Sequence, residues 1–469
     1  MSNLASKTED HALEAVPDGD RQSWWQISWS TAGIGTTLIA LFVGALATFA
    51  AGIKIGVLAG VFVSVIGGLL GWGMGHIAYR TGLSSSVLAR LYGFGRTGSA
   101  IVALTFAVFI IGSICFENVM IYKGLIFWLD LQDNNVNRLA IYSMLTVIWI
   151  LLTAFGFRVM ARVASLTVVG FLGSLTYISI AVINQSGQDW GSVLSFGSQF
   201  APSALQAMGI HDDFGKFTFC VNIMIGFAGG LALIDADIGR YARTSRDIGI
   251  AAFVGAFFLN VLMVIIGGMV MYAGSGQIIE YHVAHGMERA AATAAVLQSP
   301  DAVAAAFIIF GGALGGILMI MAQGKIQVLN TYSASLSLTS LFDSTIGWKP
   351  GRIVFVVGAN MLACLMIYAN LLHVFESFMT ILGVLTTCFA AIILLDYFWA
   401  ANRRQQRELA VAWNWAAVAA LACSFILAHY VLISLVPIEF FTSFISTLVL
   451  YPAFYLLFER RAKAASRYA

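Results

Sequence analysis

Two ionisable side chains, Glu117 and Lys325, lie deep inside long apolar segments. The only other charged residue in 98–128 is Lys123, near the end of that stretch, and Lys325 is the only one in 302–341. A carboxylate can accept hydrogen bonds or a proton, and an ammonium group can donate hydrogen bonds or release a proton. Such a group is costly inside an apolar helix, so it normally faces a cavity or a partner. These two positions are therefore the first candidates for a binding or proton-transfer site.

The composition predicts an integral membrane protein. Of the 469 residues, 59% are hydrophobic and 10% are charged, and the mean hydropathy is +0.87, which is more apolar surface than a soluble fold can bury. No basic stripe with interleaved aromatic residues indicates nucleic-acid binding, and no motif of an enzyme is present. The five cysteines fall in apolar segments and are expected to be buried hydrophobes, so we expect no metal or cofactor. The polar residues 1–27 predict a disordered cytoplasmic tail rather than a signal peptide.

Apolar segments of about 20 residues indicate membrane-spanning helices. We therefore expect an all-α protein with twelve transmembrane helices, near 29–52, 55–77, 98–122, 139–156, 161–184, 217–236, 247–273, 302–341, 352–369, 375–396, 409–431 and 436–457. The eighth is too long for one perpendicular crossing. It predicts either a tilted helix that runs past the membrane or a span with an outer re-entrant piece.

The distribution of basic residues predicts the orientation. With the N-terminus inside, the outer segments contain only Lys54, Lys123, Arg138, Lys216 and Arg289. The other lysines and arginines, apart from Lys325, fall in inner segments, and positive residues favour the cytoplasmic side. We therefore expect a multi-pass protein of the cell (inner or plasma) membrane with both termini in the cytoplasm.

Glycine-rich stretches at 33–37 and 226–230 fall inside spans 1 and 6. They lie at matching places if residues 28–185 and 217–400 form two inverted repeats. Helices interrupted by glycine at matching places indicate a transporter binding site. Close helix packing is the alternative interpretation, because small residues let two backbones approach.

Four motifs carry a family resemblance, and in chain order they are 76–99, 233–247, 329–338 and 394–404. They resemble the loop after span 2, the acidic-then-arginine end of span 6, the Asn-x-Tyr-Ser segment of span 8 and the Asp-Tyr end of span 10 in cytosine and purine permeases of the nucleobase–cation symport family.

The resemblance covers about residues 30–410 and implies a leucine-transporter-like fold. Its ten core helices, a 5+5 inverted repeat, would occupy 28–400, with two peripheral helices at 401–457 and a cytoplasmic tail at 458–469. It also implies uptake of a small heterocycle, usually with a co-transported cation.

In that family the substrate lies between spans 1, 3, 6 and 8, where a planar heterocycle needs aromatic plates and a few fixed polar groups. The resemblance puts the usual span-3 tryptophan position at Ser113, the next polar position at Glu117 and the span-6 aromatic at Phe227. Since the tryptophan is absent, a phenylalanine is expected to replace it, and the candidates are Phe42, Phe109 and Phe116. A core or lipid-facing place is the alternative for each phenylalanine.

Polar groups complete the predicted site. Glu117 can accept hydrogen bonds from a ring N–H and an exocyclic amine together, and the alternative is a structural acid inside the bundle. The amides of Gln327 and Asn330 can contact the edge of the substrate, or else bond helix to helix. The predicted substrate-binding residues are Gly35, Phe42, Ser113, Glu117, Phe227, Gln327 and Asn330.

Lys325 and Glu117 are the predicted coupling residues. In sodium-coupled proteins of this fold, two hydroxyl residues of span 8 bind the ion, and alignment on Tyr332 puts Lys325 and Ile326 at their positions. An ammonium group would replace the charge of sodium and isoleucine cannot bind a hard cation, so we expect no sodium site and proton coupling. The alternative is that Lys325 extends to the cytoplasmic surface.

Charged groups at the inner helix ends are predicted to pair and to anchor the helices, and a role in gating is the alternative. These are Asp235 and Asp237 with Arg240, and Asp396 with Arg403.

Together these features predict a transporter, not an enzyme, that imports a cytosine- or purine-type nucleobase by alternating access. A carrier of a related heterocycle (a hydantoin, allantoin or a vitamin precursor) is the alternative, and a channel is the third reading. The expected partners are the small heterocycle and the lipid bilayer; the oligomeric state stays open.

Overall fold

The fold is described from a computed structural model that covers residues 15–154, 172–173, 175–298, 303–348, 350–368, 375–400 and 411–465. In this part of the chain all regular secondary structure is helical, apart from one isolated backbone bridge between Gln22 and Ala242. The composition explains this result, because a helix satisfies its own backbone hydrogen bonds in lipid.

Each of the twelve expected spans overlaps a helix of the described residues. Spans 1 to 6 are α2 (Trp24–Gly35) with α3 (Leu38–Ala51), α4 (Ile53–Thr81), α6 (Ser99–Trp128), α7 (Asn135–Ala154), the helix Leu175–Gln185, and α11 (Asp213–Gly239). Spans 7 to 12 are α12 (Ser245–Phe257) with η2 (Phe258–Leu262) and α13 (Met263–Ala284), α15 (Val303–Ile346), α16 (Arg352–Tyr368), α17 (Phe375–Leu395) with η4 (Asp396–Ala400), α18 (Trp415–Ile426) with η6 (Leu427–Val431), and α19 (Glu439–Ala465). Half of predicted span 5 lies outside the described residues.

The loops also carry short helices, namely η1 (Asp18–Asp20), α5 (Ser85–Leu91), α9 (Trp190–Ser195), α10 (Pro202–Ala207) and α14 (Arg289–Gln298). Within the described residues, seven helices are each long and apolar enough to cross a membrane, and the bent pair α2–α3 makes an eighth. The chain is thus a multi-pass membrane protein.

The structure corrects two predicted boundaries and resolves the shape of span 8. The predicted tail does not extend to residue 27, because Val16 is buried, its N–H donates to the carbonyl of Gly82, and α2 begins at Trp24. At the other end, α19 continues past residue 457 to Ala465. Gly312 interrupts α15 with a φ of 51°, so span 8 consists of two helical pieces; whether the first piece is re-entrant stays a prediction.

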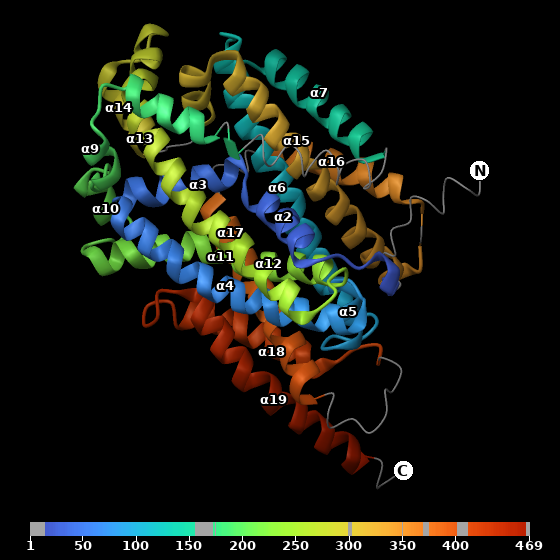
Figure 1. Cartoon of the computed structure of the whole chain (residues 1–469). Coiled ribbons are helices and arrows are strands. Elements are labelled where there is room, and N and C mark those ends of the chain that lie inside the picture. The colour runs from blue at the N-terminus through green and yellow to red at the C-terminus, as the bar shows by residue number, and fades with distance from the viewer. Residues whose placement is uncertain are drawn as a thin grey trace.

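The core helices pack into two groups (Figure 1). The first group, which we call the bundle, contains α2–α3, α4, α11 and α12–α13. The second group, which we call the scaffold, contains α6, α7, α15 and α16. Helix α17 packs against α11 of the bundle and carries α19 and α18 at the edge of the molecule, shown in orange and red in Figure 1.

Hydrogen bonds fasten this edge to the core. The hydroxyl of Tyr451 on α19 donates to the carboxylate of Asp396 at 2.5 Å, and the amide of Asn222 on α11 donates to the carbonyl of Pro437 at 2.6 Å. Arg403, the predicted partner of Asp396, lies outside the described residues.

Candidate functional site

Span 1 is broken in the middle of the molecule. The helix axis bends by 60° between α2 and α3, and Thr36 and Thr37 form the link between them. The Thr37 hydroxyl caps α3 by accepting the N–H of Ala40 at 3.1 Å. The N-terminus of α3, with N–H groups that have no partner within the helix, therefore lies buried inside the protein. Such a helix end carries partial positive charge and favours an anion.

Glu117 on α6 lies against this helix end. Its side chain is buried, with the residue 2% exposed, and the polar groups around it are the Thr37 hydroxyl, the N–H of Ile39 and the amide of Gln323 on α15. Among the described residues, no hydrogen bond with good geometry reaches its Oε2 atom. The site thus joins three spans, 1, 3 and 8, and its carboxylate retains the capacity to accept a hydrogen bond.

Two glutamines on α15 extend the polar cluster. Gln323 is fully buried, and although it lies beside Glu117, neither of its amide atoms makes a well-formed hydrogen bond to a described residue. Gln327, one turn later, donates from Nε2 to Asn118 Oδ1 at 2.7 Å and to the Ile114 carbonyl at 3.1 Å. Its Oε1 has no described partner. Buried polar atoms normally have a hydrogen-bond partner, so this cluster has the features of a ligand site.

The other bonds of this cluster are structural. Asn118 Oδ1 also accepts the indole N–H of Trp149 on α7 at 2.9 Å. Helices α6, α7 and α15 of the scaffold are therefore tied together by one amide. The side-chain nitrogen of Gln327 therefore bonds helix to helix. That its side-chain oxygen binds substrate stays a prediction.

The remaining predicted residues of α6 and α15 have different environments. The Ser113 hydroxyl donates to the carbonyl of Phe109 on its own helix at 3.0 Å. Asn330 is buried on α15. Ile326 is also buried, and the Lys325 side chain lies outside the described part of the structure. Its predicted pairing with Glu117 thus stays a prediction.

Phenylalanines form an aromatic wall between α6, α11 and α17. Phe227 is buried on α11 and meets Phe109 edge to face, with ring centroids 6.4 Å apart. Phe109 in turn stacks on Phe106. Phe116 meets Phe378 of α17 edge to face at 5.4 Å. Of the predicted replacements for tryptophan, Phe109 is the one in direct contact with Phe227, whereas Phe42 is buried on α3.

The glycines of spans 1 and 6 behave differently from one another. Span 1 is broken as predicted, but α11 runs without interruption through residues 226–230. The predicted break in span 6 is therefore wrong, and the packing interpretation applies to it.

Close contacts explain why α11 needs these glycines. A Cβ on Gly226 would lie 3.0 Å from the carbonyl oxygen of Met379, and one on Gly229 would lie 2.6 Å from the N atom of Thr387. Both glycines thus let α17 approach. Gly35, a predicted site residue, is also a packing residue, since its Cβ would lie 3.1 Å from the carbonyl oxygen of Gly255 on α12.

The predicted ion pairs at the C-terminal end of α11 differ from the contacts in the structure. Asp237 Oδ1 accepts the N–H of Ser85 at 2.7 Å, and Arg240 Nε donates to the Asp237 carbonyl at 3.1 Å. Asp235 forms no ion pair with Arg240 within the described residues, which corrects the prediction. The reason is geometric: Asp235 points away from the end of the helix, toward α4, where Gly71 lies against its Oδ2 atom.

Sequence reasoning missed Gln323 and Phe378. The spacing of Gln323 and Gln327 by one helical turn was the available signal for the first, because it places two amides on one face of an apolar helix. No signal distinguished Phe378 from the many other phenylalanines, since its place beside Phe116 depends on how α17 packs.

Comparison with known proteins establishes the fold. No family model and no curated protein matches the chain. Among solved structures, the inward-facing conformation of Mhp1 superposes with a TM-score of 0.71 and 17% identity, over 95% of this chain and 93% of that one. Mhp1, described as a nucleobase-cation-symport-1 family transporter, also matches in its closed conformation with bromovinylhydantoin bound, at a TM-score of 0.68, 16% identity and 94% of both chains.

A Na⁺-coupled sialic acid symporter in its substrate-bound, outward-open state matches at a TM-score of 0.59 with 14% identity, over 96% of this chain and 92% of that one. At these identities the similarity is one of architecture. The chain therefore has the leucine-transporter-like fold. Its first span is broken, and the buried carboxylate of Glu117 lies against that break.

Proposed function

We propose that the protein is a secondary active transporter that imports a nucleobase-type heterocycle by alternating access. The observation that carries this proposal is the environment of Glu117. A carboxylate with accepting capacity lies at a helix N-terminus, beside the buried amides of Gln323 and Gln327. The fold supports transport, because it is shared with proteins described as transporters and symporters.

The chemistry of the cluster suits a heterocycle with adjacent donors and acceptors. Glu117 Oε2 accepts a hydrogen bond from a ring N–H or an exocyclic amine, and the Gln327 Oε1 atom can accept another. The amide of Gln323 can donate to a ring carbonyl as well as accept. Phe109 and Phe227 meet edge to face about two turns along α6 from Glu117, and apolar rings beside a few polar groups are the usual composition of a small-molecule site.

A related heterocycle is the second candidate, favoured by one observation. The closed structure of Mhp1 contains bromovinylhydantoin, and a hydantoin ring presents N–H and carbonyl groups on one edge, as nucleobases do. Selectivity then depends on whether the substrate offers an amine to Glu117.

A binding screen followed by counterflow tests the proposed transport function. Purified protein is heated with cytosine, adenine, hypoxanthine, hydantoin or allantoin, and a ligand of the folded state raises the unfolding midpoint by mass action. Each stabilising compound is then loaded unlabelled into proteoliposomes. A carrier accelerates uptake of the labelled compound, whereas a channel does not. The absence of both stabilisation and counterflow for all five compounds would contradict the proposed function.

We propose that transport is coupled to protons rather than to sodium, and that Lys325 and Glu117 exchange the proton. We also propose that both termini lie in the cytoplasm. The buried Ile326 at a predicted sodium-ligand position supports the proposed proton coupling. An inward proton gradient should drive uptake into proteoliposomes, and replacement of sodium by choline should have no effect. Lys325→Ala should retain exchange but lose concentrative uptake. Uptake that stops without sodium would contradict it.

A further inference from the structure

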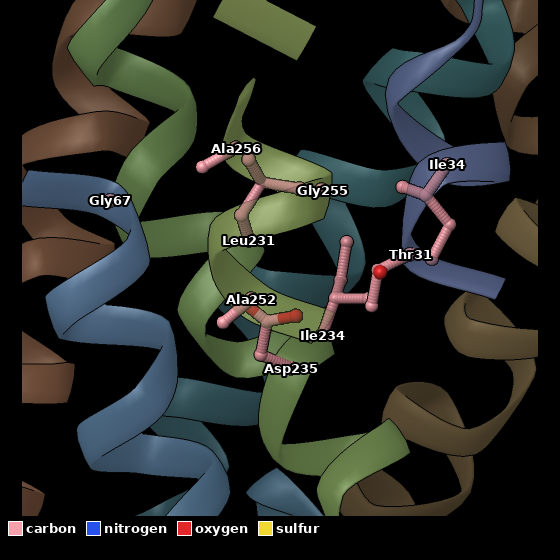
Figure 2. Close-up of a pocket in the computed structure, with 9 residues that line it drawn as sticks. All are labelled: Thr31, Ile34, Gly67, Leu231, Ile234, Asp235, Ala252, Gly255 and Ala256. Atoms are coloured by element: carbon pink, nitrogen blue, oxygen red, sulfur yellow. The ribbon is translucent and has the colours of Figure 1, made fainter. Parts of the chain in front are cut away.

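Asp235 lines a small cavity inside the bundle, away from Glu117 and the aromatic wall. Figure 2 shows its carboxylate among residues of four helices. Thr31 and Ile34 belong to α2, Gly67 to α4, and Ala252 and Gly255 to α12. The space amounts to roughly one water molecule. The cavity therefore lies within one packing group and is separate from the proposed substrate site between the groups.

The carboxylate of Asp235 is buried without a compensating partner. The residue is 7% exposed, and within the described residues it makes no hydrogen bond or ion pair. Apart from Asp235, Thr31 is the one polar side chain among the described residues of the lining, and its hydroxyl donates to the carbonyls of Ser28 at 3.0 Å and Ala251 at 2.9 Å. The proton of Thr31 is thus already engaged.

The surrounding helices bring no opposite charge into the cavity. Helix α2 has no ionisable side chain, and the ionisable groups of the other three are Lys54, His76, Tyr79 and Arg80 on α4, Asp213, Lys216, Cys220 and Asp237 on α11 with Arg240 at its end, and Arg246 and Asp247 on α12. None of them lines the cavity. His76 is engaged with the Ser245 hydroxyl at 2.7 Å, and Asp237 with Ser85.

An ionised carboxylate in such a place is unfavourable, and a carboxyl group in an apolar site normally resolves this by binding a proton. We propose that Asp235 is a proton-binding site of the transport cycle. The inference rests on the proposed proton-coupled transport and adds a second acid to it. One carboxylate oxygen takes a proton from water when the cavity is hydrated, and the neutral acid persists when the cavity is closed.

The structure offers a route for this exchange. Helix α2, which provides Thr31 and Ile34, ends at the bend before α3. A displacement of α2 would remove one wall of the cavity and admit water to Asp235. Proton release would then accompany the movement of the short half of span 1.

Infrared difference spectroscopy tests the protonation directly. We expect the wild type to show the C=O stretch of a neutral carboxylic acid at neutral pH, and the Asp235→Asn variant to lack that band. Asp237→Asn is the matched control, because the same substitution two residues away affects an acid that is already hydrogen-bonded. A wild type without an Asp235-dependent band would overturn the proposal, whatever its transport activity.

Proton flux tests the role in transport. Proteoliposomes with an internal pH dye receive whichever of cytosine, adenine, hypoxanthine, hydantoin or allantoin gives counterflow. The wild type and Asp237→Asn should acidify their lumen. Asp235→Asn should keep counterflow but lose the acidification, and its accumulation ratio should fall to about one. Full acidification in Asp235→Asn would overturn the coupling role. If the wild type itself moves no protons, the proposed proton coupling fails, and an Asp235 band then identifies a permanently neutral acid, which likewise overturns a role in the cycle.

Discussion

Two buried acids of the core, Glu117 and Asp235, occupy different environments. Glu117 faces the N-terminus of α3, a threonine hydroxyl and an amide, whereas Asp235 faces an apolar cavity within the bundle. Both lie in segments apolar enough to cross a membrane. Donors around Glu117 support a negative charge that can recognise a ligand, and their absence around Asp235 favours the neutral acid. The same residue chemistry therefore favours a ligand-binding carboxylate, able to exchange a proton with Lys325, at Glu117, and a stored proton at Asp235.

The largest effect is expected at Glu117. Glu117→Gln keeps the size of the side chain but replaces one acceptor oxygen by a donor. Loss of a needed acceptor should weaken binding by about 1–3 kcal/mol, or roughly 5- to 150-fold. Competition of unlabelled heterocycles against labelled uptake measures both affinity and selectivity. Unchanged affinity and an unchanged competition profile would show that Glu117 is not a recognition residue.

Gly71→Ala tests how closely Asp235 is confined. The added Cβ would lie 2.1 Å from Asp235 Oδ2, so the carboxylate or α4 must move, and overpacking of this kind costs about 1–3 kcal/mol. We expect a lower midpoint of thermal unfolding and altered proton flux with nearly unchanged ligand affinity.

A second substitution completes that experiment. Asp235→Ala removes the clashing atoms, so the double variant should lose less stability than the sum of the single variants. Strict additivity of the two losses would mean that the glycine and the acid are not in contact.

Thr31→Val sharpens the contrast between the two acids. It removes the hydrogen bond to the Ala251 carbonyl, which joins α2 to α12, and makes the cavity lining wholly apolar apart from Asp235. We expect a stability loss of about 0.5–1.5 kcal/mol and a stronger infrared band of the neutral acid. Glu117-dependent selectivity should stay unchanged, and a shift in selectivity would indicate that the two sites are not independent.

The smallest effect is expected at His285, which is exposed to solvent, unlike the buried acids Glu117 and Asp235. A hydrogen bond to the Tyr281 carbonyl and a contact with Asp130 raise the pKa of His285 above its ordinary value of 6.5. Because the folded-state pKa is raised, its contribution to stability is complete below the ordinary pKa and is lost as the pH rises through the raised one. His285→Gln should flatten the unfolding midpoint slightly across neutral pH. An identical pH profile would show that the contact contributes nothing.

Hydropathy predicted the fold well, because the bilayer requires apolar helices and each expected span overlaps a helix of the described residues. It could not predict which glycines bend a helix. Gly33 and Gly35 precede a real break, whereas Gly226 and Gly229 meet the backbone of α17, a contact that depends on tertiary packing.

The candidate site was predictable only in part. Glu117 was identifiable because a charge in an apolar span is costly, and its position beside α3 agrees with the threonines that follow the glycines of span 1. The pairing of Asp235 with Arg240 looked plausible from their proximity in the chain. It fails because Gly71 and Ala252 bring α4 and α12 against the acid, and no local pattern encodes that approach.

The uninterrupted course of α11 has a mechanical consequence. Phe227 and Asp235 lie on one continuous helix, about two turns or roughly 12 Å apart along its axis. A continuous helix tilts and rotates as a rigid body. In span 1, by contrast, the bend between α2 and α3 lets one half move without the other. A change of ring position at Phe227 would therefore swing Asp235 in the same movement. One rigid-body movement of α11 can therefore couple substrate binding at the centre to hydration of Asp235, without a chain of side-chain contacts between the two sites.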